Sequence, residues 1–549
     1  MLSAEDSRSE TVELRGLFSG RREMLLGLGA ATLSGTMLFL ACPKFDLWLL
    51  AWIAVVPLLF VMVHASTMRR AIFFAWWTAV IGNAGGFYWL IATIERFGSL
   101  PFIVAFLLFL VFCAYQALRF LLFGWAVRSI RQRTNLPLSL LAPVVMASCE
   151  LLVPFIFPYY LALTQSWHPV VIQLAEFTGP LGITALLFMA NGAVADLIIE
   201  GRRRRFSAIA SAVILVFVVG YGYVRTNRIA NARASAPKLR VGIVQPNVAN
   251  DQAEERSYLK APRTLTEIQQ RSAELEQAGA ELIIWPETGY ATPLSRRVGE
   301  DLPPYHPQRI RTGFTTPLIL GVVTYDESFT EESRQYNTAL LLDREGKFTG
   351  RYDKNSLLAF GEYVPGTETF PSIKQLSPVA SRFTPGADVA VFSFQATDGR
   401  EWRIGPLICL EDIIPSLGRK LAARHPHLLV NVTDDSWFGD TSEPWQHLAL
   451  SVFRTVELRT EMVRAVNPGV SAYIDATGRV YAKTYALDPT TDHRGADKLL
   501  AEVALIEGGH TVYSAVGDVF GYACVASTLF LWLILPRLGE RMRRRRASA

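Results

Sequence analysis

The chain has 549 residues, too many for one ordinary domain, and its length predicts three or more domain-sized units. Half of the residues are hydrophobic and only 19% are charged. The mean hydropathy of +0.24 is high for a soluble protein. The net charge of +5 comes from short basic clusters beside apolar runs, without a basic stripe of interleaved aromatics, which argues against a nucleic-acid partner.

The first half of the chain consists mainly of long apolar segments. We expect residues 1–23 to form a tail, seven spans to follow within 24–225, and an eighth span at 512–536. Most of these runs have about 18 residues or more, enough to cross a hydrocarbon core of about 30 Å. The sequence therefore predicts a bundle of about eight transmembrane helices. The first seven runs are 24–42, 45–64, 71–93, 100–127, 137–162, 169–199 and 206–224.

The first run has two features of export signals. Arg21 and Arg22 precede it as in a twin-arginine signal, and it ends in Phe39-Leu40-Ala41-Cys42, which loosely resembles a lipoprotein cleavage site. Because six further spans follow directly, we favour an uncleaved first span with basic residues at its inner end.

Positive charges occupy every second loop between the spans. Since cytoplasmic loops carry the excess of lysine and arginine, this alternation places both termini, including the basic tail 537–549, in the cytoplasm. Seven crossings then place residues 226–511 on the far side of the membrane. The clusters are Arg15, Arg21 and Arg22; Arg69 and Arg70; Arg128, Arg131 and Arg133; Arg202 to Arg205; and Arg537, Arg541 and Arg543 to Arg546.

The ionisable residues within the expected spans include Arg119, Glu150, Glu176 and Asp196. An ionisable side chain at membrane depth is a functional candidate by default. The alternative is that these residues lie near span ends, pair with one another or face the interior of the bundle. The sequence leaves both interpretations open.

A soluble domain follows the seventh span. Residues 226–237 are polar and small, as expected of a linker, and within 238–511 short β-rich runs alternate with amphipathic stretches, which is typical of an α/β layered domain. The expected strands are Leu239–Val244, Leu282–Trp285, Leu318–Val323, Thr338–Leu342, Val389–Phe394, Ile404–Ile408 and Leu428–Val432. The expected helices are Tyr258–Gln277, Asp412–Arg424 and Pro444–Arg464.

Two charged residues of this domain are candidates for the chemistry of a site. Glu287 comes after an apolar strand that Pro286 interrupts, so its carboxylate should project from the strand end. Lys354 ends Arg351-Tyr352-Asp353-Lys354, which follows a strand–turn pair. Taken singly, each has an ordinary interpretation as a charge at the end of a strand or on the surface.

The third candidate residue is a cysteine at the end of an expected strand. Cys409 follows the apolar run Ile404–Ile408 and precedes Glu411 and Asp412, a pattern that predicts a buried strand passing into a helix. A helix N-terminus favours the thiolate form of cysteine, although a lone buried cysteine is usually inert. The other cysteines are scattered in or beside apolar runs without a CxxC pair, so we expect neither a disulfide framework nor a metal site. They are Cys42, Cys113, Cys149 and Cys524.

The three residues are chemically complementary. A nucleophilic thiol needs a base, and a carboxylate such as Glu287 can serve if burial raises its pKa. A cation such as Lys354 can stabilise an oxyanion and favour the thiolate of Cys409.

In order and spacing these segments resemble the nitrilase superfamily, whose metal-free Glu–Lys–Cys centre cleaves or transfers acyl groups. With eight spans and the domain inserted before the last, almost the whole chain after about residue 20 is similar to the apolipoprotein N-acyltransferase family. This resemblance implies an αββα sandwich inserted in the helical bundle. The matching motifs are Trp285-Pro286-Glu287, Tyr352-Asp353-Lys354, Phe360-Gly361-Glu362-Tyr363-Val364-Pro365, Cys409-Leu410-Glu411, Asp435-Ser436-Trp437-Phe438-Gly439 and Pro444-Trp445-Gln446-His447.

The resemblance also implies residue roles, with no cofactor and no metal. Cys409 would be the nucleophile, Glu287 the general base and Lys354 the oxyanion stabiliser. Glu362 would be a second supporting carboxylate, and Glu411 and Trp437 would be supporting or lid residues. Leu410 departs from the aromatic residue, usually tyrosine, expected directly after the nucleophile, which puts a polar contact at that position in doubt.

The implied reaction has two steps. Cys409 would take an acyl chain from a phospholipid, expected to be phosphatidylethanolamine, and the α-amine of diacylglyceryl-cysteine in an apolipoprotein would then attack the thioester. The enzyme would be a monomer in the bacterial inner membrane with its catalytic domain on the periplasmic side. An apolar lid would keep water from the thioester. Ser436–Trp445 is the candidate lid, although its aromatic residues also fit ordinary loop packing.

Two other functions remain compatible with the sequence. A membrane-tethered amidase would use the same three residues, but a single anchor would suffice for it. A non-enzymatic membrane scaffold with a relic domain would not require Glu287, Lys354 and Cys409 to be intact.

Overall fold

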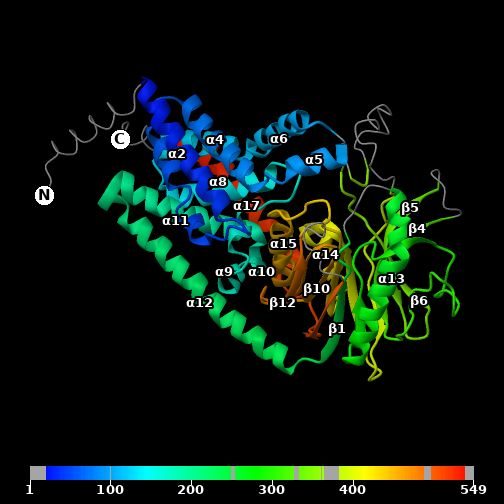
Figure 1. Cartoon of the computed structure of the whole chain (residues 1–549). Coiled ribbons are helices and arrows are strands. Elements are labelled where there is room, and N and C mark those ends of the chain that lie inside the picture. Colours follow the sequence, from blue (N-terminus) through cyan, green and yellow to red (C-terminus); the bar gives the residue numbers. More distant parts are fainter. Residues whose placement is uncertain are drawn as a thin grey trace, which may run out of the picture.

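The computed structural model describes residues 20–98, 100–248, 254–326, 333–359, 361–363, 383–487 and 496–537. It consists of a bundle of apolar helices and an α/β domain that meets one end of the bundle (Figure 1). Several expected features lie outside the described residues: most of the N-terminal tail, the basic C-terminal tail after Arg537, and Phe360, Val364 and Pro365 of one motif.

The helical bundle is built from residues before 236 and after 511. Its elements are α2 (Gly20–Leu40), η1 (Trp48–Trp52), α3 (Val56–His64), α4 (Met68–Gly86), α5 (Leu90–Gly98), α6 (Phe102–Gln116), α7 (Leu118–Thr134), α8 (Leu138–Leu152), η2 (Leu161–Gln165), α9 (Pro169–Ile172), α10 (Ala175–Thr178), α11 (Pro180–Glu200), η3 (Gly201–Arg204), α12 (Arg205–Ser235), α16 (Val512–Val516), α17 (Val519–Leu529) and η6 (Phe530–Ile534).

Four helical stretches among the described residues are long and apolar enough to cross a membrane, by length and composition. Each of the eight expected runs contains helix, but the number of crossings stays a prediction. The 33-residue stretch Phe102–Thr134 would measure about 50 Å if straight, more than one hydrocarbon core. The stretches are Gly20–Leu40, Phe102–Thr134, Pro180–Ser235 and Val519–Arg537.

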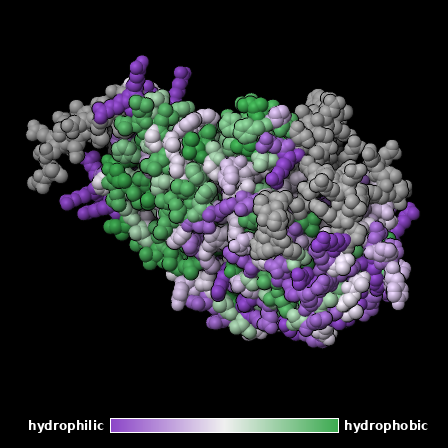
Figure 2. Space-filling view, viewed as in Figure 1, coloured by the Kyte–Doolittle hydropathy of each residue, from purple (hydrophilic) through white to green (hydrophobic). Residues whose placement is uncertain are grey.

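The outer surface of the bundle is apolar. Figure 2 shows hydrophobic residues covering the helices, whereas the α/β domain presents a largely hydrophilic surface. Large apolar side chains such as Phe206, Val216 and Phe217 of α12 are 73–82% exposed, which is unfavourable in water and expected in lipid. The distribution is that of a membrane protein.

The expected linker 226–237 is mostly helical. Helix α12 continues to Ser235, and the guanidinium of Arg233 lies 2.6 Å from the carboxylate of Glu461 in the α/β domain. The polar composition of this segment therefore reflects the last turns of a helix that leaves the apolar bundle and packs beside the second domain.

Arg119, Glu150, Glu176 and Asp196, the ionisable residues named above in the expected spans, all have protein partners. Asp196 accepts hydrogen bonds from the first amides of α8, those of Leu138 at 2.9 Å and Ser139 at 3.0 Å. Glu176 pairs with Arg225 and with Arg459 of the α/β domain, both at 2.9 Å.

The other two residues of this set join elements inside the bundle. Arg119 donates to the carbonyl of Tyr159 at 2.7 Å, and Glu150 accepts from the amide of Leu161 at 3.0 Å. All four residues therefore have structural contacts that account for their burial.

The α/β domain contains two sheets packed face to face. In one, the order is β13 (Asp497–Ala504), β1 (Lys238–Gln245), β2 (Leu282–Ile284), β4 (Leu318–Tyr325), β5 (Gln335–Leu342) and β6 (Phe348–Asp353), with β3 (Tyr290–Ser295) also paired to β4. In the other, it is β12 (Val480–Ala486), β11 (Gly469–Ile474), β10 (Glu461–Val466), β9 (Leu428–Thr433), β8 (Glu401–Ile408) and β7 (Phe392–Gln395).

Apolar side chains from both sheets form one core, in which Ile243 and Ile284 of the first sheet cluster with Ile408 and Val430 of the second. Helix α13 (Glu254–Gln277) covers the outer face of the first sheet. Helices α14 (Pro415–Ala422) and α15 (Glu443–Leu458) cover the second. The layers are thus αββα, as the resemblance implied.

The domain begins and ends on neighbouring strands. β1 pairs with β13 in antiparallel register from Lys238↔Ala504 to Gln245↔Asp497. Because α12 enters this pair and α16 follows it, the domain can be inserted between two helices of the bundle without separating them.

The expected helix Pro444–Arg464 is wrong in its last part. Helix α15 ends at Leu458, Arg459 has a left-handed φ of +52°, and Glu461–Val466 is the buried strand β10. This strand pairs in parallel with β9, so a neighbour distant in sequence determines its conformation.

Candidate active site

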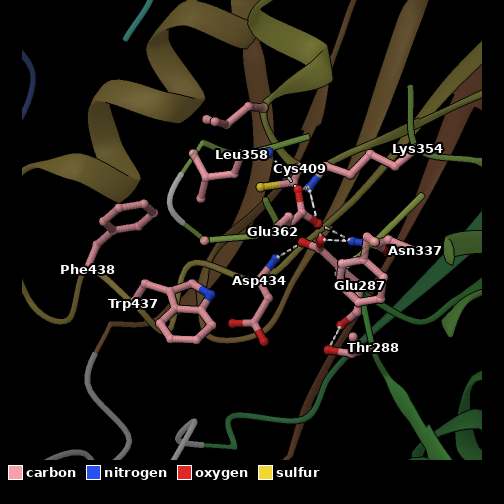
Figure 3. Close-up of a pocket in the computed structure, with 13 residues that line it drawn as sticks. Glu287, Thr288, Asn337, Lys354, Leu358, Glu362, Cys409, Asp434, Trp437 and Phe438 are labelled. Carbon is pink, nitrogen blue, oxygen red and sulfur yellow. Dashed lines mark hydrogen bonds and ion pairs between the residues drawn. The ribbon is translucent and has the colours of Figure 1, made fainter. Parts of the chain in front are cut away.

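Three strands from the two sheets deliver the predicted residues to one cavity. Glu287 follows β2, Lys354 follows β6 and Cys409 follows β8. All three line a cavity of about 170 Å³, together with Glu362, Leu410 and Trp437 (Figure 3). Five of the six candidate residues named from the sequence therefore line one cavity, and the sixth, Glu411, contacts the segments on either side of it.

Cys409 stands at a sharp turn. Its φ of +55° lies in the left-handed region, where a residue with a Cβ is strained, and such strain is typical of functional sites. The side-chain amide of Asn431 holds the Cys409 carbonyl at 2.9 Å. The turn is followed by a five-residue 3₁₀ helix, η5 (Cys409–Ile413), and α14 starts only at Pro415.

The resting form of Cys409 differs from the thiolate expected at a helix N-terminus. Burial raises the pKa of the Cys409 thiol well above its ordinary value, the Glu287 carboxylate raises it further, and Lys354 opposes both. Because the α-helix begins six residues later, its dipole does not act at the sulfur. The thiol is therefore neutral at rest and needs a base.

Glu287 is buried and held from three sides. Its carboxylate accepts from the side-chain amide of Asn337 at 2.6 Å and from the backbone amide of Asp434 at 2.9 Å. The ammonium of Lys354 lies 3.3 Å away. Burial and the nearby Glu362 raise the pKa of Glu287, although Lys354 and Asn337 oppose the shift. A carboxylate with a raised pKa is suited to accept a proton from a thiol.

A glycine on the neighbouring strand makes room for the backbone at Glu287. A Cβ at Gly321 of β4 would lie 2.5 Å from the Cα of Glu287, closer than such atoms approach. Glycine at this position therefore allows the segment after β2 to cross directly over β4.

Lys354 is the cation of this site. It is 1% exposed, and its ammonium lies 2.9 Å from Glu362 as well as 3.3 Å from Glu287. Burial would lower the pKa of Lys354, but Cys409, Glu287 and Glu362 in their ionised forms raise it well above its ordinary value. Lys354 therefore stays charged. It can face the oxyanion that develops on a carbonyl oxygen when the Cys409 sulfur attacks the carbonyl carbon.

Glu411 joins the nucleophile turn to the lysine loop. Its carboxylate accepts from the hydroxyl of Tyr352 at 2.8 Å and from the amides of Ile408 at 2.9 Å, Asn355 at 2.7 Å and Ser356 at 3.0 Å. Four donors from both sides of the site converge on one buried side chain, so Glu411 fixes the distance between Cys409 and Lys354.

Asn337 is a site residue that the sequence analysis missed. It lies within strand β5 and its side-chain amide donates to Glu287 and, at 2.8 Å, to Glu362. No motif marks it, and its polarity within an apolar strand was the only available signal.

We expect Asn337→Leu to shift the acidic limb of the pH–rate profile to higher pH. The lost hydrogen bonds favour the charged form of Glu287, so without them its pKa rises further and less base is ionised at neutral pH. The rate of acyl-enzyme formation against pH measures this. Thr338→Val, which changes the opposite face of the same strand, is the control. An unchanged limb in Asn337→Leu would contradict the assignment.

The aromatic loop between β9 and α15 connects the cavity to the bundle. Trp437 and Phe438 line the cavity, and the ring of Phe438 lies edge-on to Trp89 with centroids 5.2 Å apart. Lys44 pairs with Asp440 at 2.9 Å, and Gln446 donates to the carbonyl of Gly86 at 2.9 Å. The loop thus packs on the end of the bundle, directly beside the apolar helices.

Comparisons with known proteins agree with this architecture. Residues 34–193 match the model of the apolipoprotein N-acyltransferase N-terminal domain, and residues 240–489 match that of carbon-nitrogen hydrolases. An apolipoprotein N-acyltransferase of Geobacter metallireducens is 32% identical over 520 residues, which cover 92% of this chain and 94% of the relative. One of Bdellovibrio bacteriovorus is 31% identical, with 83% and 85% covered.

A likeness to a solved structure is also found. Saccharomyces cerevisiae Nit3, a member of the nitrilase superfamily, is 17% identical and has a TM-score of 0.34, with 51% of this chain and 94% of Nit3 covered.

Proposed function

Since the chain belongs to the apolipoprotein N-acyltransferase family, we propose that Cys409 carries an acyl chain from a membrane phospholipid to the N-terminal amine of a diacylated apolipoprotein. The observation that carries this proposal is the position of the cavity. Cys409, Glu287 and Lys354 share it with Trp437 and Phe438, and Phe438 packs on Trp89 of the apolar bundle.

In the first step the Cys409 sulfur attacks the carbonyl carbon of a phospholipid ester while Glu287 accepts the thiol proton. The oxyanion that forms faces the ammonium of Lys354. Its collapse breaks the ester C–O bond, leaves a thioester on Cys409, and the lysophospholipid oxygen takes the proton from Glu287.

In the second step the α-amine of the acceptor attacks the thioester carbonyl. Glu287 accepts a proton from the amine, the C–S bond breaks, and the sulfur regains the proton. The net change converts one ester and one amine into one amide and one lysophospholipid. Trp437 and Phe438 exclude water, which would otherwise hydrolyse the thioester.

The test uses the full-length protein in liposomes of phosphatidylethanolamine, the donor we propose, with a synthetic diacylated lipopeptide. We expect the mass of the lipopeptide to rise by one acyl group, with one lysophospholipid formed per product. A lipopeptide with a blocked α-amine is the control and should stay unchanged. Release of free fatty acid without an acylated lipopeptide would instead support a hydrolase.

We further propose that the protein acts as a monomer in the bacterial inner membrane, with residues 238–511 in the periplasm and both termini in the cytoplasm. The alternation of basic loops supports this orientation.

Single cysteines test the orientation. The five native cysteines are buried, so an added exposed cysteine is labelled selectively. We expect Tyr305→Cys, at a fully exposed position of the α/β domain, to react with a membrane-impermeant maleimide in intact spheroplasts. Arg203→Cys in η3 is the matched variant and should react only after permeabilisation. The reverse pattern would contradict the orientation.

A further inference from the structure

A chain of charged side chains lies behind the nucleophile turn and takes no direct part in the proposed acyl transfer. The two ring nitrogens of His447 lie 3.0 Å from Asp412 and 3.1 Å from Asp435, and the guanidinium of Arg464 lies 2.9 Å from Asp412. All four side chains are 98–100% buried. Ion pairs buried to this degree are costly unless their geometry satisfies both partners.

The two carboxylates belong to the two segments that build the cavity. Asp412 lies in η5, three residues after Cys409. Asp435 follows Asp434, whose backbone amide holds Glu287, and precedes Trp437 of the cavity wall. His447 of α15 is therefore the bridge between the nucleophile turn and the segment that holds the base.

The hydrogen bonds of His447 define the charge of its imidazole ring. A neutral imidazole donates one hydrogen bond, whereas each nitrogen of His447 faces a carboxylate oxygen, and only the imidazolium donates to both. Two cations, His447 and Arg464, then balance Asp412 and Asp435. Glu443, whose carboxylate lies 3.9 Å from the ring, completes the surroundings. Burial and the charge of Asp435 raise the pKa of Glu443 well above its ordinary value, so it adds no charge.

We propose that His447, as an imidazolium between Asp412 and Asp435, is a positioning residue that holds Cys409 in register with Glu287. The inference rests on the proposed function, because the register matters only if the thiol of Cys409 is the nucleophile. A neutral ring would release one carboxylate and let the two segments move apart. A displacement of 1 Å at a reacting centre lowers the rate by about 10²-fold.

The same cluster has one other chemical interpretation. Asp435, Glu443 and His447 offer ligand atoms within 4.8 Å of one another, close enough for a metal ion. Arg464 argues against it, because its guanidinium already supplies the second positive charge beside Asp412. Elemental analysis of the purified protein distinguishes the two.

The test compares wild type, His447→Gln, Asp435→Asn and the double variant in single-turnover formation of acyl-Cys409. We expect His447→Gln to slow this step by about 10²-fold with little change in the lipid concentration that gives half-maximal rate. In His447→Gln, Asp412 keeps Arg464 as its partner and Asp435 is left without a cation. Asp435→Asn removes that unbalanced charge, so the double variant should be faster than His447→Gln, by about tenfold. His427→Gln, at the far end of β9, should match wild type.

The pH profile supplies a second signature. The two carboxylates raise the pKa of His447 to about 9, although burial and Arg464 oppose this, while the pKa values of Lys354 and Cys409 lie well above their ordinary values. The wild-type rate should therefore fall as the pH rises through about 9, and this limb should be absent from the double variant.

Several outcomes would overturn the inference: a His447→Gln rate within about twofold of wild type, a double variant no faster than His447→Gln, or a stoichiometric metal that His447→Gln loses. If the His447→Gln protein is not recovered from membranes, the charge-balanced double variant should still be recovered. If the double variant is also not recovered, that result counts against the proposal. If wild type itself forms no acyl-Cys409, the proposed function fails instead.

Discussion

Cys409→Ser should abolish lipoprotein N-acylation, with a loss of about 10⁴-fold or more in the transfer rate, while membrane insertion is kept. A serine hydroxyl is a far weaker acid than a thiol, and the Glu287 carboxylate is too weak a base to remove its proton. Oxygen in place of sulfur adds no bulk at a buried position, so the turn after β8 should retain its conformation.

The measurement is mass spectrometry of lipoproteins from a strain that carries only this variant. Diacylated lipoproteins should accumulate in place of triacylated ones. Cys524→Ser in α17 is the matched control, since that cysteine is equally buried but lies in the bundle. Triacylation at the wild-type level in the Cys409→Ser strain would exclude Cys409 as the nucleophile.

Glu287→Gln should lower the rate of acyl-enzyme formation by about 10²- to 10⁴-fold, the range for loss of a general base. Glutamine has almost the same shape but cannot accept the thiol proton, and burial keeps the Cys409 thiol neutral without a base. Its amide group would also face the donors of Asn337 and Lys354, which lie 2.6 Å and 3.3 Å from the Glu287 carboxylate.

The pH dependence identifies the base. Burial raises the pKa of Glu287, so the wild-type rate should fall as the pH drops through this raised value and protonates the carboxylate. Glu287→Gln should retain only a slow, residual rate without this acidic limb, whereas Glu300→Gln, at an exposed position, should resemble wild type. An acidic limb that survives in Glu287→Gln would assign the proton transfer to another group.

Local sequence patterns predicted much of the α/β domain. Apolar runs such as Leu318–Val323 and Leu428–Val432 correspond to β4 and β9, because strands buried on both faces are continuous hydrophobic segments. Strand β10 was missed, since it contains Glu461 and Arg464, which appear polar in sequence and are neutralised by Arg233 and Asp412. Partners so distant along the chain leave no local signal.

The residues of the candidate site also divide into those that sequence patterns predicted and those that they did not. The order and spacing of the motifs around Glu287, Lys354 and Cys409 resemble the nitrilase superfamily, and that resemblance predicted one shared site, which the common cavity agrees with. Asn337 and His447 lie inside a strand and a helix, and only the folded chain shows what they contact. The protonation of Cys409 was also beyond the sequence, because it depends on burial and on where α14 begins.

The most direct test of the account is the mass of the Cys409 peptide after the purified protein is mixed with phosphatidylethanolamine alone. In the absence of an acceptor amine, the thioester should accumulate. We predict one acyl group on that peptide, released by hydroxylamine and, on addition of a diacylated lipopeptide, transferred to its α-amine. An unmodified Cys409 peptide in a preparation that acylates the lipopeptide at its normal rate would contradict the account.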